Sequence, residues 1–228
     1  SGDVPSKTLA NVAYADQEMV YLIDRPDSDQ SIIFAGHVVP EKADPNDLAI
    51  EAMNQVLGGD FSARLNMNLR EDKGWSYGSY SFVVDTAAQR PLILSAPVQT
   101  DKTADSIAEM RRELRDYLND NPASESELSR VREGNTLSLP GRWETIGAVS
   151  GSLAEMVRFD LPDDYWNTFA TRTRALTVDD IMAQAQRTLK PDNMIWVVVG
   201  DRSKIEQDII DLGIGDIQYI DTDGNPVD

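Results

Sequence analysis

Cysteine is absent from the 228 residues, and histidine occurs once, at His37. The sequence can therefore form no disulfide, no thiolate metal site and no cysteine nucleophile. A zinc site needs three or four protein ligands, and the H-x-x-E-H and H-E-x-x-H motifs each need two histidines. We therefore expect no metal ligands and no catalytic residues of its own in the isolated chain.

Positive charge is scarce, because 21 lysine and arginine residues face 39 aspartate and glutamate residues, for a net charge of −18. Nucleic acids and anionic membrane surfaces need clustered positive charge, so we expect neither as a partner. The acidic balance favours solubility, and a field that attracts basic substrates is the alternative. No apolar run approaches the roughly 20 residues of a membrane span. Residues 1–15 show no signal-peptide pattern, although an upstream signal could have been removed.

Apolar alternation and apolar runs predict strands at 18–25, 30–39, 77–85, 91–98, 194–199 and 217–220. The turn chemistry of residues 26–29, P-D-S-D, indicates that the first two of these strands pair with each other. The run at 194–199, M-I-W-V-V-V, is typical of a strand that is covered on both faces or at least deeply buried.

Helical periodicity predicts helices that begin near residues 44, 62 and 124, and helices at about 102–118, 146–159, 163–174, 178–189 and 202–212. Asp44 is the expected N-cap of the first helix. Ser124 and Glu127 have the spacing of a capping box. Gly58-Gly59 is the expected left-handed end of the first helix.

The order of these elements is two strands, two helices, two strands, several helices, strand, helix and strand. Runs of strands followed by runs of helices favour an α+β fold over a regular parallel series. We expect residues 1–17 to be an irregular lead-in and residues 18–228 to form a single domain, because no interior linker or repeat is present.

The segment 57–80 carries the most distinctive pattern, L-G-G-D-F-S-A-R-L-N-M-N-L-R-E-D-K-G-W-S-Y-G-S-Y. It joins a glycine pair, a short amphipathic helix and a Lys73-Gly74 turn to a strand that is expected to open at Tyr77. Taken alone, Arg70 would end its helix and Tyr77 would begin a strand. A helix followed by a turn and a strand can also direct both side chains into one space, where a guanidinium fork and a phenol hydroxyl both act as donors.

This segment resembles the non-catalytic half of the pitrilysin/insulinase family of zinc metallopeptidases, the inverted zincins. Supporting patterns are D-R-P-x-x-x-Q-S-x-I-x-x-G at 24–36, L-P-D-D-Y at 161–165, L-T-V-D-D at 176–180 and V-V-G at 198–200. The H-x-x-E-H motif of the catalytic half has no counterpart here. The long glycine-rich loop of the α-type processing-peptidase subunit is also missing, since Gly58-Gly59-Asp60 leads directly to Phe61.

The resemblance implies a mixed, mostly antiparallel sheet packed on one side by helices. It also implies a substrate-binding half of a zinc endopeptidase that acts on peptides or unfolded polypeptides. Arg70 and Tyr77 would hold a peptide carbonyl and stabilise the developing oxyanion. Zinc would belong to a partner half that carries H-x-x-E-H, either fused upstream or present as a separate subunit.

Two other functions remain open from the sequence. The chain could be a structural scaffold subunit of the same fold, like the core subunits of respiratory complexes, or a module that binds extended peptides alone. Retention of both Arg70 and Tyr77 favours the peptidase function over the scaffold. The lack of cysteine fits the periplasm and the cytoplasm equally, and the family resemblance slightly favours the bacterial periplasm.

Overall fold

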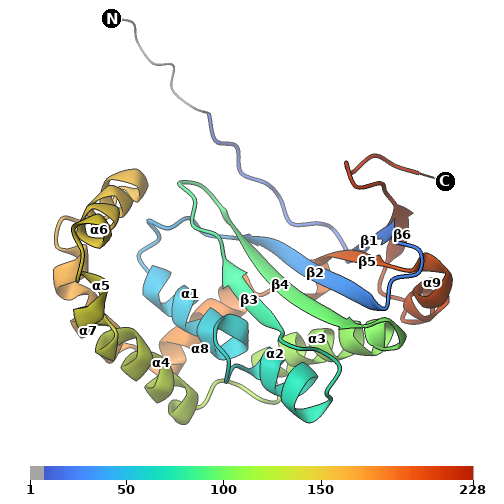
Figure 1. The fold of residues 1–228 in the computed structure, drawn as a ribbon. Coiled ribbons are helices and arrows are strands. Elements are labelled where there is room, and N and C mark those ends of the chain that lie inside the picture. Colours follow the sequence, from blue (N-terminus) through green and yellow to red (C-terminus); the bar gives the residue numbers. More distant parts are fainter. Residues whose placement is uncertain (1–7, 228) are drawn as a thin grey trace, which may run out of the picture.

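The computed structural model describes residues 8–227, which form a six-stranded sheet in the order β3-β4-β2-β5-β1-β6 (Figure 1). The strands are β1 (Met19–Asp24), β2 (Gln30–Val39), β3 (Tyr80–Val83), β4 (Arg90–Gln99), β5 (Ile195–Gly200) and β6 (Asp216–Tyr219). The pairs β3–β4, β4–β2 and β2–β5 are antiparallel, whereas β1 runs parallel to both β5 and β6. This confirms the α+β class and the mixed, mostly antiparallel sheet.

Helices cover one face of this sheet. The larger ones are α1 (Asp47–Asn54), α3 (Thr103–Leu118), α4 (Glu125–Leu137), α6 (Ile146–Phe159), α7 (Tyr165–Ala175), α8 (Val178–Thr188) and α9 (Arg202–Asp211). Figure 1 shows α1, α3 and α8 beneath the strands. Trp196 and Leu94 from the strands pack with Ile107, Met110 and Tyr117 from α3 in the main core. One-sided packing by helices is therefore confirmed.

The first two strands do not pair with each other, so that expectation is wrong. Strand β5 lies between them, parallel to β1 and antiparallel to β2. The backbone N–H of Arg25 donates to the Gly200 carbonyl at the end of β5, and Asp27 turns the chain with a positive φ of 62°. Residues 26–29 therefore carry the chain past β5 instead of closing a hairpin.

Strand β5 is deeply buried on one face and not covered on both, so the second of the two sequence alternatives holds. Trp196 and Val198 are fully buried, whereas Ile195, Val197 and Val199 are half-buried. The less buried residues belong to the open face of the sheet, where Ile32, Phe34 and Phe82 are 36%, 37% and 42% exposed. The apolar run at 194–199 therefore corresponds to a central strand with one buried face and one open apolar face.

The first helix and its end differ from the sequence expectation. Helix α1 begins at Asp47, and Asp44 instead accepts a hydrogen bond from the Asn46 N–H at 2.8 Å. Gly58 and Gly59 are not left-handed, because the helix continues through them as the π-helical turn η1 (Gln55–Gly59). A Cβ on Gly58 would lie 2.5 Å from the Ser81 nitrogen, so this glycine allows close packing of the helix against β3.

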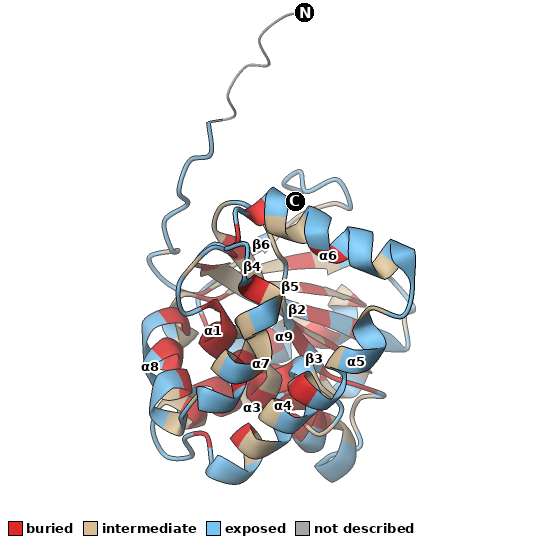
Figure 2. Cartoon of the chain, turned by 90° about the vertical axis from the view of Figure 1, so that its left-hand side faces the viewer, coloured by how far each residue is buried: buried red, intermediate tan, exposed pale blue. Residues whose placement is uncertain are grey.

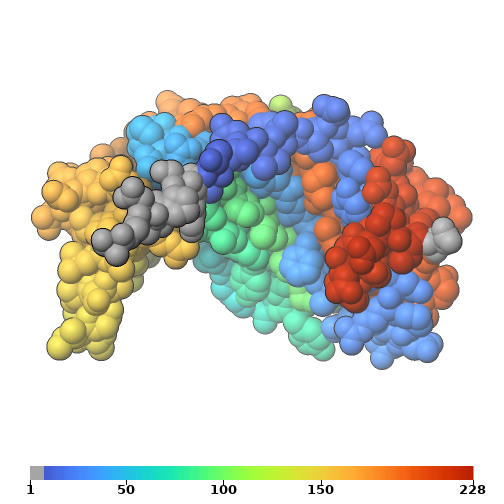
Figure 3. Space-filling model, turned by 90° about the horizontal axis from the view of Figure 1, so that it is seen from above, coloured from blue at the N-terminus to red at the C-terminus, as the bar shows by residue number. Residues whose placement is uncertain are grey.

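The other helical predictions hold more closely. Ser124 and Glu127 form the expected capping box at the start of α4, and α6 spans the residues predicted for it. A short helix that was not predicted, α5 (Leu139–Arg142), joins α4 to α6. Figure 2 shows α6 with a mostly exposed surface, and Figure 3 shows this part of the chain projecting from the body as an arm.

Candidate functional site

Arg70 belongs to a helical segment whose apolar side is buried in the core. After α2 (Arg64–Asn66) the chain continues as η2 (Met67–Asp72), and Leu65 and Leu69 are buried as their spacing predicts. The helix ends at Gly74, whose φ of 66° confirms the turn at this position. The N–H groups of Trp75 and Ser76 then both donate to the Leu69 carbonyl. The turn is therefore tied to the helix that precedes it.

Tyr77 lies before the strand and not within it, which corrects the expectation that it opens β3. Ser76 forms an isolated bridge with Val98, and its hydroxyl contacts the Pro97 carbonyl at 2.6 Å and the Gly78 carbonyl at 2.9 Å. The Ser79 N–H donates to the Asn66 side chain, which draws this stretch toward α2 and away from the ladder. Tyr77 is consequently 86% exposed on a short, firmly anchored loop.

Arg70 lies at the last turn of η2 and is half-exposed. Its Nη1 pairs with Glu71 at 2.7 Å, and its guanidinium lies 4.5 Å from the centre of the Phe61 ring. No contact described for residues 8–227 joins Arg70 to Tyr77. The structure therefore places both residues on one anchored segment without bringing their side chains together, and their joint role is neither confirmed nor excluded.

Residues 74–78 also spell G-x-S-x-G, a nucleophile-elbow pattern that sequence reasoning missed. An elbow places its serine at a strand-to-helix turn. Here the order is helix, turn and strand, and the Ser76 hydroxyl contacts two backbone carbonyls. His37 pairs with Leu92, six residues along β4 from the partner of Ser76, which is a separation of roughly 20 Å. The pattern therefore forms no catalytic dyad with this histidine.

His37 has a structural role, because it packs against Tyr14 and Lys190 at the end of β2. Its Nε2 accepts the Lys190 N–H at 3.3 Å, and Tyr14 packs edge-on against its ring. Burial lowers the pKa of His37 to about 4, and the charge of Lys190 acts in the same direction. Within residues 8–227 no group of three or more histidine or carboxylate side chains is arranged to hold a metal ion.

A buried charge cluster lies between α1 and β4, and no sequence pattern predicted it because its members are scattered along the chain. It consists of Lys42, Asp47, Glu51, Asp85 and Arg90. Arg90 is fully buried, and its Nη1 lies 2.7, 2.9 and 3.0 Å from the three carboxylates in that order. Lys42 lies 3.2 Å from both Asp47 and Asp85. Two cations therefore face three carboxylates.

Protonation of one carboxylate balances this cluster. Burial raises the pKa of Glu51 to about 7, and the charges of Asp47 and Asp85 add to that rise against the opposing Lys42 and Arg90. The folded-state value lies above the unfolded value of about 4.3. The stability that protonated Glu51 contributes to the folded state is therefore complete below about pH 4 and is lost as the pH rises through about 7.

Glu51→Gln is expected to remove this pH dependence, because the amide keeps the shape of Glu51 and cannot ionise. Between pH 5 and 8 the wild-type free energy of unfolding should fall by about 1–3 kcal/mol more than that of the variant. Urea unfolding at several pH values measures this difference. Glu133→Gln, on exposed α4, is the control and should follow the wild type. Parallel pH profiles for Glu51→Gln and the wild type would contradict this assignment.

Comparison with known proteins identifies the family. The family model described as Peptidase M16 inactive domain matches residues 3–135, which is more than half of the chain. The chain therefore belongs to the inactive-domain family of peptidase M16. This confirms the resemblance to the non-catalytic half of the pitrilysin/insulinase family. A search of curated proteins found no match.

Solved structures share the fold at low sequence identity. A peptidase M16 inactive domain from Pseudomonas fluorescens matches with a TM-score of 0.75 and 24% identity, over 86% of this chain and 47% of that one. The first half of the periplasmic protease PqqL from Escherichia coli gives 0.69 and 12%, over 93% and 48%. Complex III2 from Candida albicans gives 0.67 and 12%, over 85% and 49%. The chain thus spans about half the length of these structures.

Proposed function

We propose that this chain is the substrate-binding, non-catalytic half of a zinc endopeptidase that acts on peptides or unfolded polypeptides. Arg70 and Tyr77 would act in the active site of a partner half that carries H-x-x-E-H and the zinc. In that site they would hold the peptide carbonyl and stabilise the oxyanion that forms when water attacks it. The residues 18–228 would act as one unit, with 1–17 as a lead-in.

The exposure of Tyr77 is the observation that carries this proposal. A tyrosine that is 86% exposed contributes little to its own core, yet the loop that bears it is held by Ser76, Gly78 and Ser79. Within residues 8–227 no hydrogen bond of the Tyr77 hydroxyl is described. A rigid loop that presents an unused donor fits a group that acts on another molecule.

The arrangement of two halves is supported by the coverage of the solved structures. This fold accounts for 47% of the Pseudomonas fluorescens chain and for 48% of the structure of the first half of PqqL. A partner of related fold, fused or separate, would complete the enzyme. PqqL is described as periplasmic, and we propose the periplasm for this chain also. No helix in residues 8–227 is long and apolar enough to span a membrane.

A structural scaffold is the second candidate function, because a chain of complex III2 has the same fold. A scaffold would need the buried core and the outer surfaces, but it would have no use for Tyr77. The two functions therefore differ in whether an H-x-x-E-H half accompanies the chain and whether the pair hydrolyses peptides.

Co-expression with an H-x-x-E-H half encoded upstream or next to this chain is expected to give zinc-dependent hydrolysis of a quenched-fluorescent peptide. This chain alone should cleave no peptide and retain no stoichiometric zinc after dialysis, because it has one histidine and no cysteine. Metal analysis and the peptide assay on the same samples measure both results.

The control is the H-x-x-E-H half expressed alone, which should bind zinc and turn over poorly. Chelator-sensitive hydrolysis by this chain alone would overturn the proposal. A neighbouring half without H-x-x-E-H, or a stable complex without hydrolysis, would make the scaffold the better account.

A further inference from the structure

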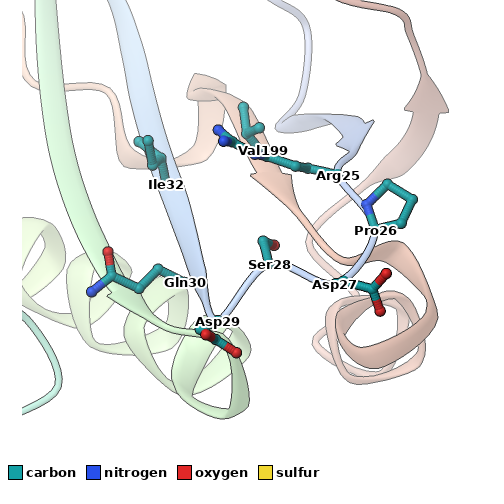
Figure 4. A pocket seen from close by; sticks show the side chains of 8 residues that line it. All are labelled: Arg25, Pro26, Asp27, Ser28, Asp29, Gln30, Ile32 and Val199. Carbon is teal, nitrogen blue, oxygen red and sulfur yellow. The ribbon is translucent and has the colours of Figure 1, made fainter.

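A cavity of about 620 Å³ opens beside the connection between β1 and β2 (Figure 4). Ile32 and Val199 belong to its lining and to the open face of the sheet, where they are partners in the β2–β5 register. Arg25 and Gln30 add polar groups to the wall. In Figure 4 the side chain of Arg25 extends across the strands toward Val199 and Ile32. The cavity therefore combines an apolar surface with a guanidinium.

Arg25 has no carboxylate within ion-pair distance in residues 8–227, although the chain carries 39 acidic residues. Asp27 and Asp29 also line the cavity, but Figure 4 shows their carboxylates pointing away from Arg25. The pKa of Lys204 is raised, first by its hydrogen bond to Asp201 and further by the charges of Asp201, Asp27 and Asp29. Both carboxylates therefore act on Lys204 of α9, and neither forms an ion pair with Arg25 in the described residues.

The loop that presents Arg25 is pinned at several points. The Arg25 N–H donates to Gly200 at 2.7 Å, and the Asp27 N–H donates to the Asp201 side chain at 3.0 Å. The Thr100 hydroxyl donates to the Ser28 carbonyl at 3.0 Å. The Ser28 Oγ is buried without a hydrogen-bond partner in the described residues. A fixed loop that presents one unpaired guanidinium can bind an anionic oxygen ligand.

The cavity lies at the same end of the sheet as Tyr77. Val199 pairs with Ile32, Ile32 pairs with Pro97, and the Ser76 hydroxyl contacts the Pro97 carbonyl. Ser76 pairs with Val98 on β4, and Tyr77 follows it directly in the chain. Two to three strand spacings of about 4.8 Å separate the cavity from Tyr77, roughly 10–15 Å. Three to five residues of an extended peptide span that distance at about 3.3 Å each.

We infer that Arg25 and its cavity bind a carboxylate of an extended peptide whose backbone Tyr77 holds three to five residues away, an assignment that rests on the proposed function. The guanidinium binds the carboxylate through two N–H groups, and the Gln30 amide in the cavity wall offers a further donor. Ile32 and Val199 accept the apolar part of the adjoining residue. The carboxylate comes from the peptide C-terminus or from an aspartate or glutamate side chain.

A peptide carboxylate fits this site better than a phosphate does. One guanidinium balances one negative charge, whereas a phosphate group carries close to two at neutral pH. The net charge of −18 further disfavours a dianion. Millimolar inorganic phosphate should therefore compete poorly with a peptide for this site.

Fluorescence anisotropy on the full 228-residue chain tests the inference with three labelled eight-residue peptides of otherwise identical sequence. One ends in a free carboxylate, one in an amide, and one in an amide with glutamate as its last residue. Wild type should bind the free acid about five- to tenfold more tightly than the plain amide, as expected for a charge-assisted pair. If the glutamate peptide binds as tightly as the free acid, the site accepts a side-chain carboxylate as well as a terminal one.

Arg25→Gln should bind the free acid and the amide equally, and Arg25→Lys should keep part of the difference. Arg25 is exposed, so both variants should retain the wild-type circular dichroism spectrum. Tyr77→Phe should leave the ratio of acid to amide binding as it is in the wild type. Equal binding of acid and amide by wild type, or an unchanged ratio in Arg25→Gln, overturns this inference alone. Failure of the folded wild type to bind any of the three peptides overturns the proposed function with it.

Discussion

Tyr77→Phe in the assembled enzyme is expected to lower kcat by a factor on the order of 10²–10³, the range for the loss of one oxyanion donor. The substitution removes one hydroxyl and little volume. Since the ring is 86% exposed in this chain, folding should be unaffected. Steady-state kinetics with a quenched-fluorescent peptide measure the change, and KM should move far less than kcat if the donor acts mainly in the transition state.

Arg70→Ala should lower kcat to a similar extent, because it removes a charged fork from the same site. The ion pair with Glu71 is half-exposed and contributes little to stability, so its loss should leave the fold intact. Zinc content should be unchanged in both variants, because neither residue is a metal ligand in this proposal.

Two matched controls separate a local role from a general disturbance. Tyr14→Phe removes another exposed tyrosine hydroxyl, and Arg112→Ala removes an exposed guanidinium from α3. Both should leave kcat within about twofold of wild type, since they lie outside the anchored segment. Intact turnover in Tyr77→Phe and Arg70→Ala would reject the assigned role, as would a loss of activity that accompanies unfolding.

Arg90→Met is expected to reduce the free energy of unfolding by about 3–5 kcal/mol, the cost of breaking a buried ion pair from one side. The guanidinium is fully buried and lies within 3.0 Å of Asp47, Glu51 and Asp85. Without it, Lys42 would face three carboxylates alone. Urea unfolding at pH 7 measures the loss, and Arg112→Ala on the surface should change stability by less than about 1 kcal/mol.

A second substitution tests whether charge imbalance is the cause. Asp85→Asn in the Arg90→Met background removes one of the excess carboxylates, so it should recover part of the lost stability, whereas the same change in the wild type should not stabilise. Lower pH should also reduce the difference in free energy of unfolding between Arg90→Met and the wild type. Protonation of Glu51 removes one negative charge from the cluster and so offsets the lost guanidinium. If the two substitutions lower the free energy of unfolding additively in the double variant, the loss in Arg90→Met comes from side-chain shape and not from charge.

The sequence predicted most elements because their signals are local. The capping box at Ser124 and Glu127 satisfies its own helix end, and the apolar spacing in α3 follows from the helical period alone. Arg70 and Tyr77 were found from a motif within one segment. Arg25 stood in a recognised pattern at 24–36, but nothing in that pattern showed that its charge would remain unpaired.

By itself the sequence determined the α+β class, the family resemblance, the lack of an H-x-x-E-H motif and the residues proposed for substrate binding. The tertiary structure decided that β5 separates β1 from β2, that Tyr77 lies outside the strand, and that Arg90 pairs with Asp47 and Glu51 from a distant helix as well as with Asp85. The physical reason is the range of the interactions. Caps, turns and periodicity act over a few residues, whereas strand order and buried charge pairing depend on segments that meet only when the chain folds.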